Sequence, residues 1–381
     1  MLTYSKLSFW EKDLFFNSLD IVIVGAGIVG YSTAISLKEK FPQKKIVIVE
    51  RGYLPTGAST KNAGFTCFGS PTELLEDLQS LPEEAVIDLV RRRYQGLQIL
   101  LDRCGKKQID YIPCGSHEVF TDSKKDANNF QNVTRKINYL NELIEQATTI
   151  KNNFNISYNK FGFNNISKLI SSKGEGQIDT GKMMDRLHRI AVDMGVHILF
   201  STEVESWEHT DSNQIRIKTN YGDFETKKLI IATNGLSKKI LPSIELEPAR
   251  AQVIITKPLD KKPFEGTFHY DAGYYYFRNV KNRILLGGGR NVNFNREKTT
   301  QIENTEEILN ALKDLLHNVI LPNQTVEIEH QWAGIMGIGK TRNPVVKELS
   351  PNIFAGIRLG GMGVALGSLV GKELSELIQF D

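Results

Sequence analysis

Two short, continuous runs of β-branched residues stand out in the hydrophobic pattern near the N-terminus. Residues 21–24 and residues 46–49 both read Ile-Val-Ile-Val. Runs of this length and composition predict strands that are buried on both faces. Between them, a glycine-rich turn at 25–30 leads into a helix. Residues 20–50 therefore predict a strand, a helix and a second, parallel strand.

Helices and further strands follow along the rest of the chain. Helical spacing of apolar residues predicts helices at 82–103, 124–150, 180–194, 303–317 and after residue 363, the first with a capping box at Ser80 to Glu83. Shorter apolar runs predict strands at 111–120, 196–200, 203–207, 229–232, 250–256, 283–287 and 325–334, and hairpins at 215–226 and 267–277. Residues 1–19 are expected to be a lead-in segment, with Phe9 and Trp10 packed onto the body.

Composition and charge exclude several classes of protein. The 381 residues are 40% hydrophobic and 24% charged, as in an ordinary globular chain. A net charge of +3 gives no reason to expect a nucleic-acid partner. The three cysteines, Cys67, Cys104 and Cys114, have no metal-binding or disulfide spacing, which fits a reducing compartment. With no export signal and no membrane-spanning run, we expect a cytoplasmic protein without a metal site.

The turn after the first strand has the spacing of a dinucleotide-binding motif. Gly25 allows a tight turn, Gly27 allows the backbone to approach a pyrophosphate, and Gly30 allows the helix to pack close to the strand. The phosphates would then lie at the positive end of the helix. Glu50, about 20 residues after the last glycine, is placed to accept ribose hydroxyl groups. The alternative is that these glycines form a turn in some other kind of strand–helix–strand unit.

Two later segments are rich in small residues at places where a backbone could contact a flat ligand. Residues 57–64 follow the acid-tipped strand, and residues 233–235 end the buried strand at 229–232. Such segments can press a backbone against a cofactor and donate N–H groups to it. For residues 57–64, a plain surface loop is an equal alternative.

The motifs together resemble those of one superfamily, the FAD-dependent D-amino acid oxidases, glycine oxidases and sarcosine oxidases. The resemblance covers nearly the whole chain. Lys61 stands where this superfamily usually has an arginine. The motifs that carry it are residues 25–30 with Glu50, 57–64, 231–235, Arg250 with Gln252, 286–290, 332–334 and 360–363.

The resemblance implies an α/β fold with two interleaved domains. A Rossmann-like FAD-binding domain of the glutathione-reductase type would comprise residues 1–81, 166–244 and 330–381. An α+β substrate domain, built on a large mixed sheet that roofs the flavin, would comprise residues 82–165 and 245–329.

The resemblance also implies FAD as the cofactor. Some relatives attach the flavin through a cysteine near the C-terminus, but no cysteine follows Cys114, so we expect non-covalent FAD. A helix N-terminus near Gly361 to Val364 would stabilise the anionic reduced ring. The implied FAD-binding residues are Gly25, Ala26, Gly27, Ile28, Val29, Gly30, Glu50, Arg51, Ala58, Ser59, Lys61, Asn62, Ala63, Gly64, Val204, Thr233, Asn234, Gly235, Gly334, Ile335, Gly360, Gly361, Met362, Gly363 and Val364.

The implied reaction is oxidation of a C–N bond of an amino acid or amine, by hydride transfer to flavin N5 and hydrolysis of the imine. Relatives that take amino acids usually have a carboxylate-binding arginine where this chain has Met336. A replacement cation would be Arg278, Arg290 or Lys340, or the substrate is an amine without a nearby carboxylate. Tyr275, Arg278 and Met336 are the expected pocket-lining residues, and His269 is a weaker candidate.

Two alternatives to this function stay open. One is a 2-hydroxy-acid oxidoreductase on the same fold, and the other is a non-catalytic flavoprotein subunit. The sequence does not separate an oxidase from a dehydrogenase, and it does not indicate an oligomeric state.

Overall fold

The two β-branched runs form β1 (Leu19–Val24) and β2 (Ile46–Val49), which pair in parallel at the centre of an eight-stranded sheet. The computed structural model describes residues 6–322 and 324–380. Every residue of both strands is buried, as expected when helices or loops cover both faces of a sheet. The main path of this sheet is β17 (Val345–Ser350), β18 (Ile353–Ile357), β11 (Gly222–Ile231), β1, β2 and β8 (His197–Leu199).

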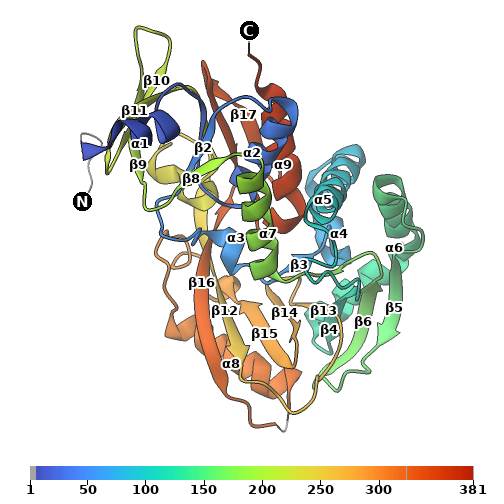
Figure 1. Ribbon diagram of the computed structural model, residues 1–381. Coiled ribbons are helices and arrows are strands. Elements are labelled where there is room, and N and C mark those ends of the chain that lie inside the picture. The colour runs from blue at the N-terminus through green and yellow to red at the C-terminus, as the bar shows by residue number, and fades with distance from the viewer. Residues whose placement is uncertain (1–5, 323, 381) are drawn as a thin grey trace.

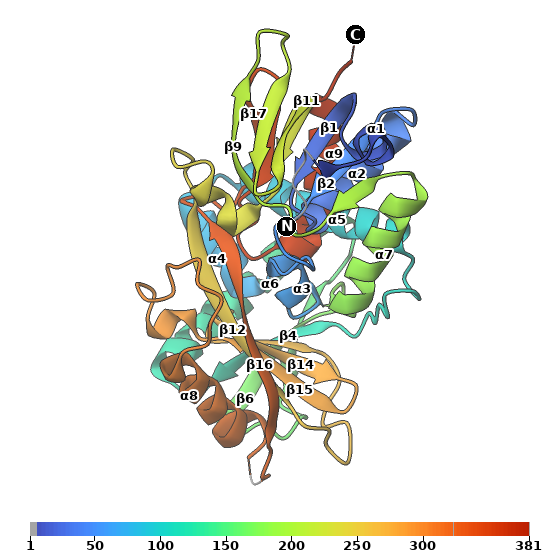
Figure 2. The same ribbon diagram turned by 60° about the vertical axis from the view of Figure 1, so that its left-hand side comes forward.

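Helices cover one face of this first sheet. Here α2 (Ile28–Lys40) packs on α9 (Gly363–Leu377) and on α7 (Thr180–Asp193), and α9 packs on α5 (Glu83–Cys104). Strands β9 (Val204–His209) and β10 (Ile215–Thr219) extend β11 as an antiparallel meander, which projects from the body in Figure 2. The short helix α1 (Phe9–Phe15) precedes β1.

A second sheet of eight strands lies below the first in Figure 1. One face carries α8 (Glu306–Leu315) and the π-helical turn Leu316–Ile320, which share an apolar core with the sheet. Its order is β16 (Ile328–Ile338), β12 (Glu247–Thr256), β15 (Arg283–Gly288), β14 (Tyr275–Val280), β13 (Thr267–Tyr270), β4 (Ser116–Thr121), β6 (Ile166–Ser172) and β5 (Phe154–Tyr158).

Shorter elements connect the two sheets. Helix α3 (Ala58–Lys61) contacts both α7 and β16, and the 3₁₀ helix η2 (Asn234–Lys239) contacts β16 and β18. Helices α4 (Pro71–Ser80) and α6 (Lys124–Thr148) pack on each other beside β4, and β3 (Phe65–Thr66) pairs with β7 (Gly176–Gln177). Because α3 and η2 touch the second sheet, the ends of β2 and β11 are brought against it.

The predicted fold class is confirmed: the protein is α/β, with a Rossmann-like sheet and a large mixed sheet. The domain bounds stay a prediction, and three elements pack differently from what these bounds imply. β6 and most of β16 were assigned to the FAD domain but lie in the second sheet. Helix α5 was assigned to the substrate domain, but it packs on α9.

Several local predictions are wrong. Ser80 ends α4, a helix that the sequence analysis missed, and α5 follows Pro82 without a side-chain cap. The predicted strands at 223–226 and 229–232 are one continuous strand, β11. Phe9 and Trp10 are 68% and 76% exposed rather than packed down, and no residue of α1 is buried. Residues 1–5 of the expected lead-in lie outside the described residues.

No helix within residues 6–322 and 324–380 combines the length and the apolar character needed to cross a bilayer.

Candidate active site

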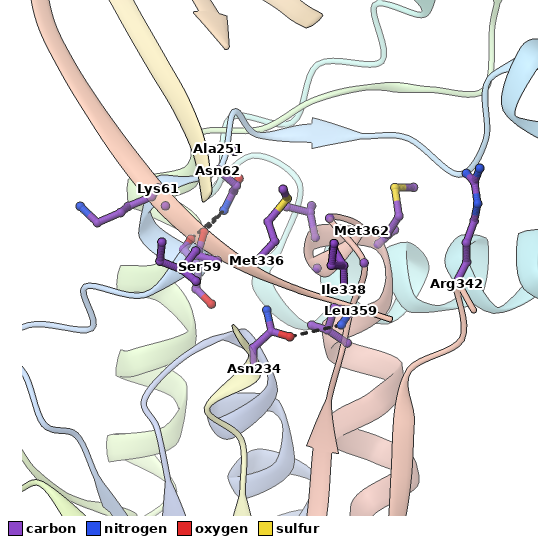
Figure 3. A pocket seen from close by; sticks show the side chains of 18 of the residues that line it. Ser59, Lys61, Asn62, Asn234, Ala251, Met336, Ile338, Arg342, Leu359 and Met362 are labelled. Atoms are coloured by element: carbon purple, nitrogen blue, oxygen red, sulfur yellow. Dashed lines mark hydrogen bonds between the residues drawn. The ribbon is translucent and has the colours of Figure 1, made fainter. Parts of the chain in front are cut away.

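A single cavity of about 1080 Å³ extends from the glycine-rich turn after β1 to the face of the second sheet that is turned away from α8. One end is lined by the ends of β1, β2 and β11 and by α3, and the other by strands β12 to β16 and by α4 and α6. Figure 3 shows part of its wall, with Met336 and Met362 near the middle. The volume is slightly above the range of about 300–1,000 Å³ that is usual for a pocket that holds one small molecule.

The glycine-rich turn has the tight geometry that its spacing predicts. Gly25 has a φ of +106°, and a Cβ on Gly30 would lie 1.9 Å from the carbonyl oxygen of Gly25. Helix α2 therefore starts directly against the end of β1. The N-cap residue of α2, Gly27, has no side chain that could accept hydrogen bonds from the first N–H groups of the helix. Ser59 Oγ accepts one of them, from Ile28 N at 3.0 Å. The positive end of α2 thus faces the cavity.

Glu50 lies at the end of β2 as predicted. Its Oε2 accepts a hydrogen bond from Ala26 N at 3.0 Å, and its Oε1 accepts one from Gly52 N at 3.0 Å. The side chain is buried but lines the cavity, so these two bonds fix the direction in which the carboxylate presents its other lone pairs. A carboxylate held in this way can accept hydroxyl groups of a ribose.

The second predicted loop forms α3 and is held in place from both sides. Asn62 Nδ2 donates to Ser59 O at 2.7 Å, and Gly64 N and Thr180 Oγ1 both donate to Asn62 Oδ1 at 2.9 Å. Trp332 Nε1 donates to Lys61 O at 3.0 Å. The loop is therefore fixed to β16, and the plain surface-loop interpretation does not fit this structure.

Asn234 connects the strand end of β11 to the last glycine-rich segment. Its Oδ1 accepts a hydrogen bond from Arg358 N at 3.0 Å. It also accepts one from Leu359 N at 3.2 Å, which Figure 3 shows. These bonds hold the segment that leads into α9, whose N-cap, Met362, makes no side-chain cap. The first turn of α9 lines the cavity, so a second positive helix end faces the same space.

The structure brings most of the predicted cofactor residues to this cavity. Four of them do not line it: Ala26, Gly30, Gly64 and Gly235 lie behind the wall, where they allow close packing. The predicted residues that line it are Gly25, Gly27, Ile28, Val29, Glu50, Arg51, Ala58, Ser59, Lys61, Asn62, Ala63, Val204, Thr233, Asn234, Gly334, Ile335, Gly360, Gly361, Met362, Gly363 and Val364.

The tyrosines at the start of β14 and just before it point to the opposite sides from those expected. Tyr274 and Tyr276 line the cavity, whereas Tyr275 packs toward α8 in the other core. The family placement was one residue out of phase, and alternation along the strand reverses the face. Across the strand pair, His269 lies opposite Tyr276 and also lines the cavity.

His269 is an uncharged group in this wall. Burial lowers its pKa to about 4, so the imidazole is neutral at pH 7. Its Nε2 is buried and has no hydrogen-bond partner within the described part of the chain. Burial also raises the pKa of Tyr276 to about 12, which keeps the phenol protonated.

Arg278 does not line the cavity, which corrects the expectation that it is a pocket residue. Its side chain is 6% exposed, and it donates to Ala63 O and, at 2.9 Å, to Ile178 O. Burial lowers its pKa to about 10, so the group is still charged at pH 7. Arg278 therefore ties the loop at residues 57–64 to the second sheet. Lys340 also lies outside the lining, and Met336 lies in it.

The sequence analysis missed an ionic cluster at the far end of the cavity. Arg342 pairs with Glu73, with Glu76 at 2.7 Å and with Asp77 at 2.8 Å, and Arg93 pairs with Glu73 at 3.0 Å. Burial alone would raise the pKa of Glu73, but the two guanidinium groups outweigh it and lower the pKa to about 2. No periodicity or motif marks these residues, since they lie on three separate segments.

Comparison with known proteins identifies the family. The model of the FAD-dependent oxidoreductase family, DAO, matches residues 20–377, which is nearly the entire chain. The chain belongs to this family. FAD is therefore its cofactor.

Known oxidases, oxidoreductases and dehydrogenases resemble the chain over almost its full length. It is 23% identical to the sarcosine oxidase subunit beta of Rhodobacter capsulatus, covering 94% of this chain and 86% of the relative. It is 23% identical to the gamma-glutamylputrescine oxidoreductase of Escherichia coli, covering 95% and 84%. The structure of L-proline dehydrogenase from P. horikoshii matches with a TM-score of 0.74 at 18% identity, covering 94% and 93%, which shows a shared fold.

The residues of the cavity fit the FAD of this family. Two helix N-termini whose own N-cap residues make no side-chain cap face one space, and each offers a positive dipole and N–H donors to a negatively charged group. The N-terminus of α2, with Gly27, would hold the pyrophosphate, and Glu50 would hold the ribose. The N-terminus of α9 would face the ring.

Proposed function

We propose that this protein oxidises a C–N bond of an amino acid or an amine. Sarcosine and gamma-glutamylputrescine, the compounds that name two of its relatives, both carry such a bond next to a C–H bond. The observation that carries the proposal is the continuity of the cavity. A cofactor end with two helix N-termini opens directly onto a wall formed by Tyr276, His269 and Met336.

When bound, FAD would supply the acceptor for the two electrons and the hydrogen that leave the carbon of the substrate. The protein must orient that carbon and stabilise the negative charge that develops. The N-terminus of α9 serves the second task, because its dipole and free N–H groups point into the cavity. The imine product then hydrolyses in water.

The wall near Met336 serves to orient the substrate. The side chains of Met336 and Met362 both lie toward the same part of the cavity in Figure 3, with Ile338 beside them. This apolar lining excludes water from the reacting carbon and fills irregular space. Tyr276 and neutral His269 are the hydrogen-bonding groups on the facing strands. With a pKa of about 4, His269 is too weak a base to hold a proton taken from a substrate ammonium at pH 7, so it serves as a neutral hydrogen-bonding group.

We propose that FAD is held without a covalent bond. Cys67 is a cavity-lining cysteine that the sequence analysis did not single out. Burial raises the pKa of its thiol well above the usual value, so it stays protonated and a poor nucleophile. Denaturation should therefore release all of the flavin into a protein-free filtrate.

The test is anaerobic bleaching of the purified yellow protein. The visible flavin band is followed against D-amino acids, N-methyl amino acids, proline, polyamines and 2-hydroxy acids. Bleaching by an amino acid or amine supports the proposal. Bleaching by 2-hydroxy acids alone would assign a C–OH bond instead, and bleaching only by dithionite would indicate a non-catalytic subunit. Hydrogen peroxide release in air then separates an oxidase from a dehydrogenase.

A further inference from the structure

The cavity has several positively charged side chains, but few can bind an anionic substrate. Three of them already pair with carboxylates: Lys125 with Asp271, Lys239 with Glu203, and Arg342 with three acids. The other cations in the described lining are Arg51, Lys61, Lys136 and Arg290.

Of these four, Arg290 alone comes from a segment that continues a strand of the second sheet. It begins the 3₁₀ helix η3 (Arg290–Val292), with one residue between it and the end of β15, and β15 lies two strands from Met336 on β16. Arg51 follows β2 at the nucleotide end, and Lys136 belongs to α6. Lys61 belongs to α3, and in Figure 3 its amine points away from Met336 and Met362.

The guanidinium group of Arg290 contacts an aromatic ring rather than a carboxylate. Its guanidinium carbon lies 4.9 Å from the centre of the Phe294 ring, and no carboxylate of the described chain lies within ion-pair distance. Glu297 is the acid whose charge acts on it, but Glu297 is committed to a two-point hydrogen bond with Arg250 at 2.7 and 2.9 Å. Burial lowers the pKa of Arg290.

A half-buried guanidinium without an anion is in an unfavourable state. It has lost part of its hydration, and the Phe294 ring compensates only modestly. A carboxylate matches its planar pair of N–H groups and forms two charge-assisted hydrogen bonds. Tyr274 lines the cavity beside it and offers a hydroxyl group. The site is therefore incomplete without an anion.

We propose that Arg290 binds the carboxylate of the substrate, so that the substrate is an amino acid rather than a simple amine. This assignment rests on the proposed function. It places the carboxylate-binding cation on the segment after β15 instead of at Met336. It also explains how the chain can have Met336 in place of an arginine and still select a substrate with a carboxylate.

The test measures binding of benzoate, with benzamide as the uncharged probe, to the FAD-loaded protein by calorimetry. R290Q should raise the Kd of benzoate about tenfold or more and leave that of benzamide unchanged. R290K keeps the charge but loses the planar fork, so its Kd for benzoate should lie between those of the wild type and R290Q. R296Q removes a nearby exposed arginine and is the matched control, with no expected change.

Equal binding of benzoate by the wild type and R290Q would overturn the inference. So would a wild-type protein that amines bleach but that binds no carboxylate, although the proposed function would then survive. If benzoate binding depends on Arg290 but no amine or amino acid bleaches the flavin, the proposed function fails and the assignment of an amino acid substrate fails with it. Flavin content and circular dichroism of each variant show that it is folded.

Discussion

Gly27→Ala is expected to weaken FAD binding while leaving the fold intact. Gly27 has a φ of −83° and a ψ of −174°, an extended conformation that alanine accepts without strain. The added Cβ would lie 2.9 Å from Ser59 Oγ, which is too close for an ordinary contact. Ser59 must therefore turn away from Ile28 N, to which it is bonded at 3.0 Å.

The size of the effect follows from these contacts. Losing the cap on α2 should lower the free energy of unfolding by about 1 kcal/mol. In the proposed site, the methyl group would also occupy space that the pyrophosphate needs to reach the N–H groups. The loss of one charge-assisted hydrogen bond, about 1.5–3 kcal/mol, raises the Kd of FAD roughly tenfold to a hundredfold.

The assay is titration of the FAD-free protein with FAD, followed by quenching of flavin fluorescence, together with thermal unfolding of the FAD-free protein. S59A separates the two contributions, because it removes the cap and leaves the space at Gly27 open. G181A, in the first turn of α7 away from the cavity, is the matched control. A Kd for G27A within threefold of the wild type would refute the assignment of the pyrophosphate to this turn.

Three further predictions test the site and the core. Tyr276→Phe should lower kcat/KM about tenfold or more at unchanged flavin content, whereas Tyr275→Phe should change it little, since only Tyr276 lines the cavity; equal effects would contradict the assigned faces. Burial raises the pKa of Glu175, and likewise that of Glu118, to about 7, so the folded state holds extra protons between pH 4.5 and 7 and stability falls as the pH rises through this window. E175Q should reduce the slope of Tm against pH there and leave the part that comes from Glu118. Glu297 and Arg250 are both 1% exposed, so E297Q should lower the free energy of unfolding in urea by about 3 kcal/mol. Replacing both residues with Met should cost less, and additive losses would argue against a coupled pair.

The sequence was most informative where chemistry requires a fixed spacing. Gly25, Gly27 and Glu50 lie as predicted, because a tight turn, a close approach and a strand-end acid leave few alternatives within one local unit. The strands β1 and β2 were equally clear, since burial on both faces demands continuous apolar runs. The fold class followed from the order of such motifs.

Side-chain direction and distant contacts could not be predicted in the same way. The face of Tyr275 depends on register, and an error of one residue reverses it. Arg278 was a reasonable pocket candidate by type, but its acceptors, Ala63 O and Ile178 O, come from segments 215 and 100 residues away. The pairing of Arg342 with the acids of α4 likewise depends on tertiary packing. Periodicity contains no information on such contacts.

The central claim is that this protein takes a hydride from a carbon next to nitrogen. The most direct measurement is a single anaerobic turnover, in which the substrate that bleaches the flavin is mixed with the FAD-loaded protein and the carbonyl product is quantified. The account predicts one equivalent of 2-oxo acid or aldehyde for each equivalent of flavin reduced. Bleaching without a carbonyl product, or a flavin that no amino acid or amine reduces, would contradict it.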